Sequence, residues 1–251
     1  MSERSFHYDP GRHKLTLDGF EIPSVTTILG AGLPKPALKH WAAKSVAEWA
    51  VDHKDAWKDL PREAAVDLLK REPLRFTASR ARVGTAVHGA INYYAALGEP
   101  PDDLSDEEWG YYNAALSYLT EQQVEIVESE VTVYSREHAY GGTFDLLQKR
   151  GWDDIELADF KTSKAVYPDV ALQLVAYARA EFIGRTDGSE EPMPKVARGV
   201  IVRLGADGRY EAVPVALGDN VFAAFRACRA LYEWDRGLSR RVLGPPLRAA
   251  A

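Results

Sequence analysis

The sequence predicts an α/β fold in which helices flank a mixed sheet, with an N-terminal hairpin and a helical subdomain before it. Three observations predict this class. Apolar residues recur at helical spacing in the first half of the chain, polar and apolar residues alternate from residue 124 onward, and helical spacing returns between and after the predicted strands. A chain of 251 residues suits one such domain with an elaboration.

Residues 1–122 are expected to form the hairpin and the helical region. Turn chemistry around Pro10 predicts a hairpin whose second strand covers residues 14–17. Ser24 is a candidate N-cap for a short helix that ends near Gly32. Longer helices are predicted at residues 36–53, 62–71, 78–97 and 107–122.

Residues 123–251 are expected to hold the sheet and a C-terminal helix, and to form one integrated domain with the first part of the chain. Cys228 lies in that last helix, where a small apolar residue is expected to be buried, and as the single cysteine it can form no internal disulfide. Strands are predicted at residues 124–135, 140–148, 155–162, 196–204 and 210–215, and helices at residues 169–182 and 221–234.

The composition excludes some classes of protein. A formal net charge of −6 argues against a protein that coats nucleic acid non-specifically, although an enzyme that binds DNA in a local groove can be acidic because metal-binding carboxylates add negative charge. The apolar runs are too short to span a bilayer, and the polar start of the chain does not resemble a signal peptide. The expected location is therefore the cytoplasm.

Strand geometry predicts a cluster of charged side chains. Asp159 and Lys161 are two residues apart in a predicted strand, so their side chains share one face while Phe160 points to the other. If the preceding hairpin turns near Trp152, Asp145 lies opposite Asp159 on the neighbouring strand. Two close carboxylates repel unless a positive group lies between them, and oxygen ligands favour Mg²⁺ or Mn²⁺.

Four short motifs follow one another along the chain. They are Arg82-Val83-Gly84-Thr85-Ala86-Val87-His88, Gly142-Thr143-Phe144-Asp145, Asp159-Phe160-Lys161 and Gln173-Leu174-Val175-Ala176-Tyr177. In this order the chain resembles the PD-(D/E)XK nucleases of the RecB-type branch, with their histidine, G-x-x-D, D-x-K and Q-x-x-x-Y motifs. Residues 23–29 further resemble the mitochondrial genome maintenance exonuclease and related phage exonucleases. The resemblance covers residues 5–180 and implies a restriction-endonuclease-like sheet.

The resemblance also implies the roles of the site residues. His88, Asp145 and Asp159 are the implied metal ligands together with the carbonyl of Phe160, and Lys161 is implied to hold the attacking water and the scissile phosphate. The implied contacts with substrate or with the metal shell come from Glu130, Gln173 and Tyr177. Arg82 is a candidate phosphate contact because it lies close to His88 in the sequence. Relatives with an iron–sulfur cluster use four cysteines, so that cluster is excluded, and no Walker A sequence is present.

Several of these residues have a second interpretation that involves no chemistry. Taken alone, His88 is a packed or surface histidine, Asp145 a turn or edge-strand acid, and the pair Asp159 and Lys161 a solvated strand face. Gln173 and Tyr177 can be a half-exposed helical face. Core packing is the expected role of Trp41, Trp49 and Trp57, with base stacking as the alternative, while Arg75, Arg80 and Arg82 are either phosphate contacts or solvated charges.

The predicted function is a Mg²⁺- or Mn²⁺-dependent deoxyribonuclease. The resemblance favours an exonuclease that acts on single-stranded DNA or DNA ends. Its expected context is phage or bacterial replication, recombination or repair. Its expected partners are DNA and a single-strand-binding protein or recombinase, and no membrane. A structure-specific endonuclease and a non-catalytic DNA-binding accessory protein stay open as alternatives.

Overall fold

The computed structural model describes residues 6–9, 11–12, 14–151 and 154–246. Contacts between Cα atoms divide the chain into two compact units, Met1–Leu33 with Ala90–Ala251 and Pro34–Gly89. The second boundary lies inside one continuous helix, α4 (Glu72–Leu97). The predicted boundary at residue 122 separates two segments of the sequence within one domain, and it stays a prediction.

A three-stranded antiparallel sheet begins the larger unit. Its strands are β1 (Phe6–Asp9), β2 (Lys14–Leu17) and β3 (Phe20–Ile22). The predicted hairpin is confirmed, and the third strand was not predicted. Asp18 and Gly19 have φ angles of 52° and 83°, which is the geometry of a tight hairpin turn into that third strand.

Helix α1 (Val25–Gly32) confirms the predicted N-cap. The hydroxyl oxygen of Ser24 accepts a hydrogen bond from the backbone N–H of Thr27 at 3.1 Å. At its other end Gly32 packs against Cys228, where a Cβ on the glycine would lie 2.6 Å from the cysteine backbone. The single cysteine is buried, as expected for a small apolar residue in a helix contact.

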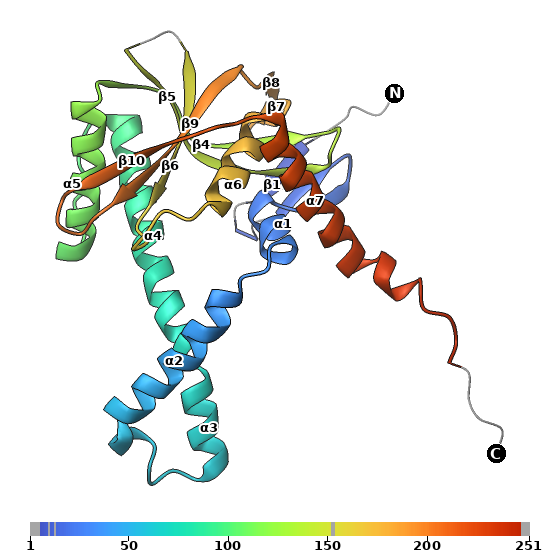
Figure 1. Cartoon of the computed structure of the whole chain (residues 1–251). Helices are drawn as coiled ribbons and strands as arrows, with labels where there is room; N and C mark the ends of the chain where they lie inside the picture. Colours follow the sequence, from blue (N-terminus) through green and yellow to red (C-terminus); the bar gives the residue numbers. More distant parts are fainter. Residues whose placement is uncertain (1–5, 10, 13, 152–153, 247–251) are drawn as a thin grey trace. The chain divides into compact units, whose positions relative to one another are not determined.

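A seven-stranded mixed sheet is the centre of the larger unit (Figure 1), in the order β10-β9-β6-β5-β4-β7-β8. Strands β6 and β9 pair in parallel, whereas the other neighbours are antiparallel, so the predicted mixed sheet is confirmed. The strands are β4 (Val124–Ser135), β5 (Tyr140–Arg150), β6 (Ile155–Lys161), β7 (Phe182–Gly184), β8 (Glu190–Pro192), β9 (Val196–Leu204) and β10 (Tyr210–Val215).

Helices cover both faces of this sheet (Figure 1). Strand β6 shows it, because its alternate side chains meet different helices. The ring of Phe160 packs edge-on against Tyr118 of α5 (Asp106–Glu121), whereas Leu157 belongs to the core cluster of Leu174 on α6 (Asp169–Ala178). Helix α7 (Asp219–Arg236) joins α6 and α1 over that second face.

Two short strands of the large sheet, the end of one helix and the start of another differ from the sequence prediction. The helix predicted at residues 169–182 ends at Ala178, because residues 182–184 pair with β4 and form β7, and β8 pairs with β7. Such three-residue strands depend on their pairing partners rather than on their own pattern. Helix α4 begins at Glu72, six residues before the predicted start, with Pro73 in its first turn, where a missing N–H costs nothing.

The smaller unit consists of helices. It contains α2 (Pro36–Asp52), the 3₁₀ turn η1 (Lys54–Ala56), α3 (Arg62–Lys70) and the first part of α4. The tryptophans of this unit are half-buried among its own side chains. Trp41 lies 5.6 Å from the ring of Phe76, and the indole N–H of Trp57 donates to the carbonyl of Ala50 at 2.9 Å. Of the helices within the described residues, none is long and apolar enough to cross a membrane.

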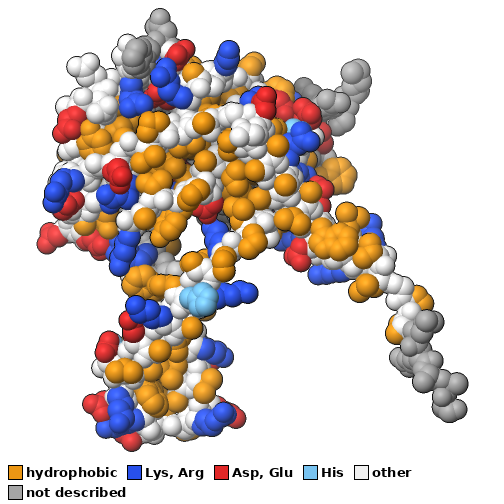
Figure 2. All heavy atoms as spheres, viewed as in Figure 1, with side chains coloured by type: hydrophobic (Ala, Val, Ile, Leu, Met, Phe, Trp, Pro, Cys, Tyr) orange, Lys and Arg blue, Asp and Glu red, His pale blue; other side chains and the backbone are white. Residues whose placement is uncertain are grey.

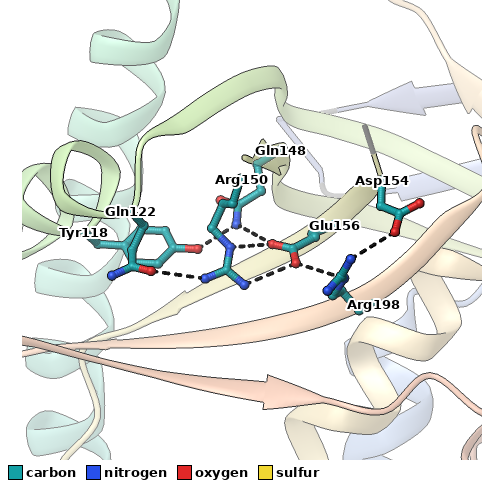
Figure 3. A network of polar contacts seen from close by, with 7 residues as sticks. All are labelled: Tyr118, Gln122, Gln148, Arg150, Asp154, Glu156 and Arg198. Carbon is teal, nitrogen blue, oxygen red and sulfur yellow. Dashed lines mark hydrogen bonds and ion pairs between the residues drawn. The ribbon is translucent and has the colours of Figure 1, made fainter. Parts of the chain in front are cut away.

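A buried carboxylate links the strands at the end of the sheet where β6 begins (Figure 3). Glu156 has no exposed surface and accepts hydrogen bonds from Arg150 at 2.5 and 3.2 Å. Arg198 of β9 adds an ion pair to the same carboxylate at 3.1 Å. Gln148 connects the network to the hydroxyl of Tyr118 on α5 at 2.6 Å. Charged and polar contacts therefore join β5, β6, β9 and α5. Their centre, Glu156, lies three residues before Asp159 on β6.

Candidate metal centre

Three carboxylates lie in one row across the neighbouring strands β4, β5 and β6. The register pairs Ser129 with Leu146 and Val131 with Phe144, so Glu130 is opposite Asp145. The paired residues of β5 and β6 end at Leu146 and Ala158, and the same register extended by one position sets Asp145 opposite Asp159. The row is therefore Glu130, Asp145, Asp159.

Asp145 occupies the place where the hydrogen-bond ladder between β5 and β6 stops. Its Oδ2 atom accepts a hydrogen bond from the backbone N–H of Phe160 at 2.7 Å. The side chain of Phe160 is buried against Tyr118, as its predicted inward direction requires. Asp145 thus satisfies the backbone of the D-x-K segment while its carboxylate stays between the other two acids.

Lys161 and Asp159 form an ion pair on β6. The Nζ atom of Lys161 lies 2.8 Å from Oδ1 and 2.6 Å from Oδ2 of Asp159, whose side chain is only 3% exposed. Burial, the largest single influence, lowers the pKa of Lys161, but the charges of Asp159 and Asp145 outweigh it and raise the pKa above the usual lysine value. The lysine is therefore a cation at neutral pH.

A group with the donor atoms of a metal site lies beside this ion pair. Within the described residues, His88, Glu130 and Asp145 each offer one ligand atom, and these atoms lie within 4.8 Å of one another. An imidazole nitrogen and two carboxylate oxygens are donor atoms that suit a divalent cation, so these three residues could hold one. Asp159, also predicted as a ligand, is paired with Lys161 in this structure, and its role as a ligand stays a prediction.

The histidine is part of the group because α4 is attached to β4 one helical turn later. Asn92 accepts a hydrogen bond from the hydroxyl of Ser129 at 2.9 Å, and Ser129 directly precedes Glu130. His88 lies four residues before Asn92, so both side chains are on the same face of the helix. Helical spacing within α4 could not reveal this, because the attachment is a tertiary contact.

Glu130 adopts an unusual backbone conformation. Its φ angle is 52°, in the left-handed region that side chains other than glycine rarely occupy, in the middle of strand β4. Backbone strain of this kind costs free energy and is concentrated at functional sites. The sequence indicated Glu130 only as a substrate or outer contact, whereas the structure places its carboxylate in the group that can hold a metal.

Tyr177 and Gly142 explain why two of the motifs occur together. The buried ring of Tyr177 on α6 occupies the space beside Gly142, where a Cβ would lie 2.8 Å from its Cε1 atom. Gln173 donates to the hydroxyl of Tyr177 at 3.3 Å. Burial raises the pKa of Tyr177, the hydrogen bond from Gln173 lowers it, and the charges of the three carboxylates in the row raise it further, so the hydroxyl stays protonated at neutral pH.

The basic residues predicted to contact phosphate lie in the smaller unit. Arg82 is exposed and Arg80 is half-buried on α4. Arg75 lies 3.5 Å from Glu72, one turn earlier on the same helix. Their contacts with substrate stay predictions.

Comparisons with known proteins find a similarity in fold and no match in sequence. A scan against models of protein families and a search of curated proteins both return no match. Among solved structures, the chain is similar to an alkaline exonuclease (LHK-Exo) from Laribacter hongkongensis, with a TM-score of 0.34 and 13% sequence identity over 61% of this chain and 82% of that chain.

Proposed function

We propose that this chain is a Mg²⁺- or Mn²⁺-dependent deoxyribonuclease that hydrolyses phosphodiester bonds. The observation that carries the proposal is the row of Glu130, Asp145 and Asp159 across three strands, with Lys161 beside it. Three carboxylates in such proximity are costly to fold unless cations compensate them, and one lysine is a single charge. The four motifs that resemble PD-(D/E)XK nucleases support the same reaction.

The proposed ligands are His88, Glu130 and Asp145, with the carbonyl of Phe160 as a further candidate. When bound, the cation polarises a phosphoryl oxygen and lowers the pKa of water. Asp145 fixes the backbone at Phe160 through the hydrogen bond from its N–H, which keeps the D-x-K segment beside the ligands. Asp159 is the proposed link between Lys161 and the metal site, and its carboxylate would be a further candidate to hold the cation.

Lys161 has an electrostatic role in this proposal. Because its ammonium group is charged, it can donate hydrogen bonds to a phosphate oxygen and stabilise the negative charge that grows there as water adds. Asp159 orients the ammonium group before substrate binds. Gln173 and Tyr177 are proposed to keep the edge of the site in place from α6.

An exonuclease on single-stranded DNA or DNA ends is the proposed specific activity, and it is supported by the sequence motifs alone. Circular single-stranded DNA tests it, because an exonuclease leaves a circle intact and an endonuclease cuts it. End-labelled linear DNA, labelled at each end in turn, then gives the polarity.

Cleavage by the Lys161→Ala variant tests the site. Loss of a preorganised electrostatic group predicts a fall of about 10²- to 10³-fold in the rate of cleavage. Lys70→Ala is the matched control, since this lysine pairs with Asp67 on the exposed surface of α3. Undiminished cleavage by Lys161→Ala would remove the lysine from the mechanism.

Binding of Mn²⁺ tests the ligand set and separates an enzyme from a DNA-binding accessory protein. Titration of the wild-type chain with Mn²⁺, followed by electron paramagnetic resonance, should show binding that Glu130→Gln and His88→Ala each weaken. Equal binding by Glu130→Gln and the wild type would exclude Glu130 as a ligand. A wild-type chain that binds DNA but no cation would support the accessory protein instead.

A further inference from the structure

The hydrogen bond between Asn92 and Ser129 lies directly beside the candidate metal ligands. The hydroxyl of Ser129 on β4 donates to Oδ1 of Asn92 on α4 at 2.9 Å, and both side chains are half-buried. Glu130 is the next residue of β4, and His88 lies one helical turn before Asn92. The bond therefore joins the two elements that carry two of the three residues that could hold a cation.

The side chains of Ser129 and Glu130 both reach α4, which a regular strand does not allow. Neighbouring residues of a strand point to opposite faces of the sheet. Ser129 nevertheless bonds to Asn92, and the carboxylate of Glu130 offers an oxygen within 4.8 Å of the ligand nitrogen of His88. Because His88 and Asn92 share one face of α4, strand β4 departs from regular alternation between Ser129 and Glu130.

The backbone of Glu130 accounts for this departure. Its φ angle of 52° lies in the left-handed region, while the ladder to β5 continues on both sides, with Ser129 opposite Leu146 and Val131 opposite Phe144. An irregular residue within a strand turns its side chain in a new direction. The left-handed conformation costs free energy at a residue other than glycine, so it persists only where surrounding contacts hold it. The bond from Ser129 to α4 is such a contact, one residue away.

Electrostatic repulsion also opposes the grouping of the ligands. Glu130 and Asp145 offer carboxylate oxygens within 4.8 Å of each other, and like charges at this distance repel unless a cation lies between them. Surface acids of the chain have cations beside them instead. Lys70 lies 2.7 Å from Asp67 on α3, and Figure 2 shows acidic and basic side chains side by side over the smaller unit. A contact that holds Glu130 in place offsets the repulsion within the site.

We propose that Asn92 and Ser129 are positioning residues of the metal centre. Their hydrogen bond holds α4 against β4, so that the imidazole of His88 and the carboxylate of Glu130 meet at one cation. Contacts that orient metal ligands from behind typically change metal affinity by about 10- to 100-fold. The inference rests on the proposed metal-dependent function, and it adds two residues that lie outside the four sequence motifs.

Titration of the full chain with Mn²⁺, followed by electron paramagnetic resonance, tests this proposal. Asn92→Ala and Ser129→Ala should each bind Mn²⁺ about 10- to 100-fold more weakly than the wild type. Alanine favours a helix more than asparagine does, so Asn92→Ala does not weaken α4 through its helix propensity. Ser129→Thr keeps a hydroxyl group on β4 and should bind Mn²⁺ as the wild type does.

Ser135→Ala is the matched control, because it removes a hydroxyl group from the same strand. The buried hydroxyl of Ser135 donates to Glu181 at 2.7 Å, and neither residue belongs to the metal group. Ser135→Ala should lower the free energy of unfolding in urea and keep the wild-type affinity for Mn²⁺. An equal loss of Mn²⁺ affinity in Ser129→Ala and Ser135→Ala would overturn the proposal, because a general loss of stability would then explain both.

Pulsed electron paramagnetic resonance of the bound Mn²⁺ shows whether the imidazole has moved. A nitrogen ligand couples magnetically to the ion, and His88→Ala should abolish this coupling. Asn92→Ala and Ser129→Ala should weaken the coupling even at saturating Mn²⁺, since α4 no longer holds His88 in place. Full nitrogen coupling in both variants would overturn the positioning role.

Failure of this inference differs from failure of the proposed function. If the wild type binds Mn²⁺ through His88, and Asn92→Ala and Ser129→Ala bind it equally well, the positioning role is overturned and the proposed site stands. If the wild type binds no Mn²⁺, the proposed function and this inference are both overturned.

Discussion

Replacement of Gly142 by alanine tests how the G-x-x-D segment and α6 fit together. An added Cβ would lie 2.8 Å from Cε1, 3.2 Å from Oη and 3.4 Å from Cζ of Tyr177. The φ angle of Gly142 is not in the left-handed region, so the backbone itself accepts alanine. The whole cost is therefore steric. The ring of Tyr177 is buried, which limits how far it can move away.

The expected loss of stability follows from two opposing effects. Overpacking of a buried site costs about 1–3 kcal/mol. Replacement of glycine by alanine in a compatible conformation stabilises by about 0.4–1 kcal/mol, because the unfolded chain loses freedom. Gly142→Ala should therefore destabilise by about 1–2 kcal/mol in urea unfolding. Gly30→Ala is the control, since nothing lies within 4 Å of its Cβ, and it should stabilise helix α1 by up to about 1 kcal/mol.

A second variant decides whether Tyr177 is the cause. Tyr177→Leu removes Cε1 and the hydroxyl, the atoms that the new methyl group meets. In that background Gly142→Ala should be neutral or stabilising, so the double-mutant cycle should give a coupling free energy of about 1–3 kcal/mol. Equal losses of stability in the two backgrounds would refute the assigned contact between strand β5 and helix α6.

Three further predictions concern stability away from the metal centre. Glu156→Ala leaves Arg150 and Arg198 without their buried partner, and should lower the free energy of unfolding by about 3 kcal/mol. Glu137→Ala, at an exposed glutamate, should change the free energy of unfolding by less than about 0.5 kcal/mol. Equal effects of the two substitutions would refute the role of the network. The hydrogen bond from Arg136 lowers the pKa of Glu190 below its usual 4.5. The stabilisation from this ion pair is therefore present above pH 4.5 and is lost as the pH falls through the lowered pKa of the folded state. The stability of Glu190→Gln should depend less on acid pH than that of the wild type, and an unchanged pH profile would contradict this. Gly110→Ala should destabilise the chain strongly, because a Cβ there would overlap the carbonyl oxygen of Ala206, and thermal unfolding at the wild-type temperature would exclude that close packing.

The regular elements could be predicted from the sequence because their signals are local. The alternation from residue 124 and the cap at Ser24 depend on neighbours within a few positions, and both agree with the structure. The two-residue spacing of Asp159 and Lys161 placed both on one strand, where they form an ion pair. By contrast, β7 and β8 exist through pairing with β4 and with each other, which no local pattern contains.

The arrangement of the site could be predicted only in part, for the same physical reason. Strand spacing predicted Asp145 opposite Asp159, and the register of β5 with β6, extended by one position, agrees with that prediction. The turn expected near Trp152 lies outside the described residues. The place of His88 depends on the bond between Asn92 and Ser129, a contact between distant segments. Glu130 joins the group through its place opposite Asp145 and has a left-handed backbone that its residue type does not favour.

The most direct test of the central claim is the rate of cleavage of end-labelled single-stranded DNA, measured over a range of Mg²⁺ concentrations for the wild type and Asp145→Asn. Loss of a ligand that contributes several kcal/mol predicts a rate lower by about 10³-fold at saturating Mg²⁺. The wild-type rate should rise with Mg²⁺ and fall to background in EDTA. Cleavage that persists in EDTA, or an Asp145→Asn variant as fast as the wild type, would contradict a metal-dependent nuclease at this site.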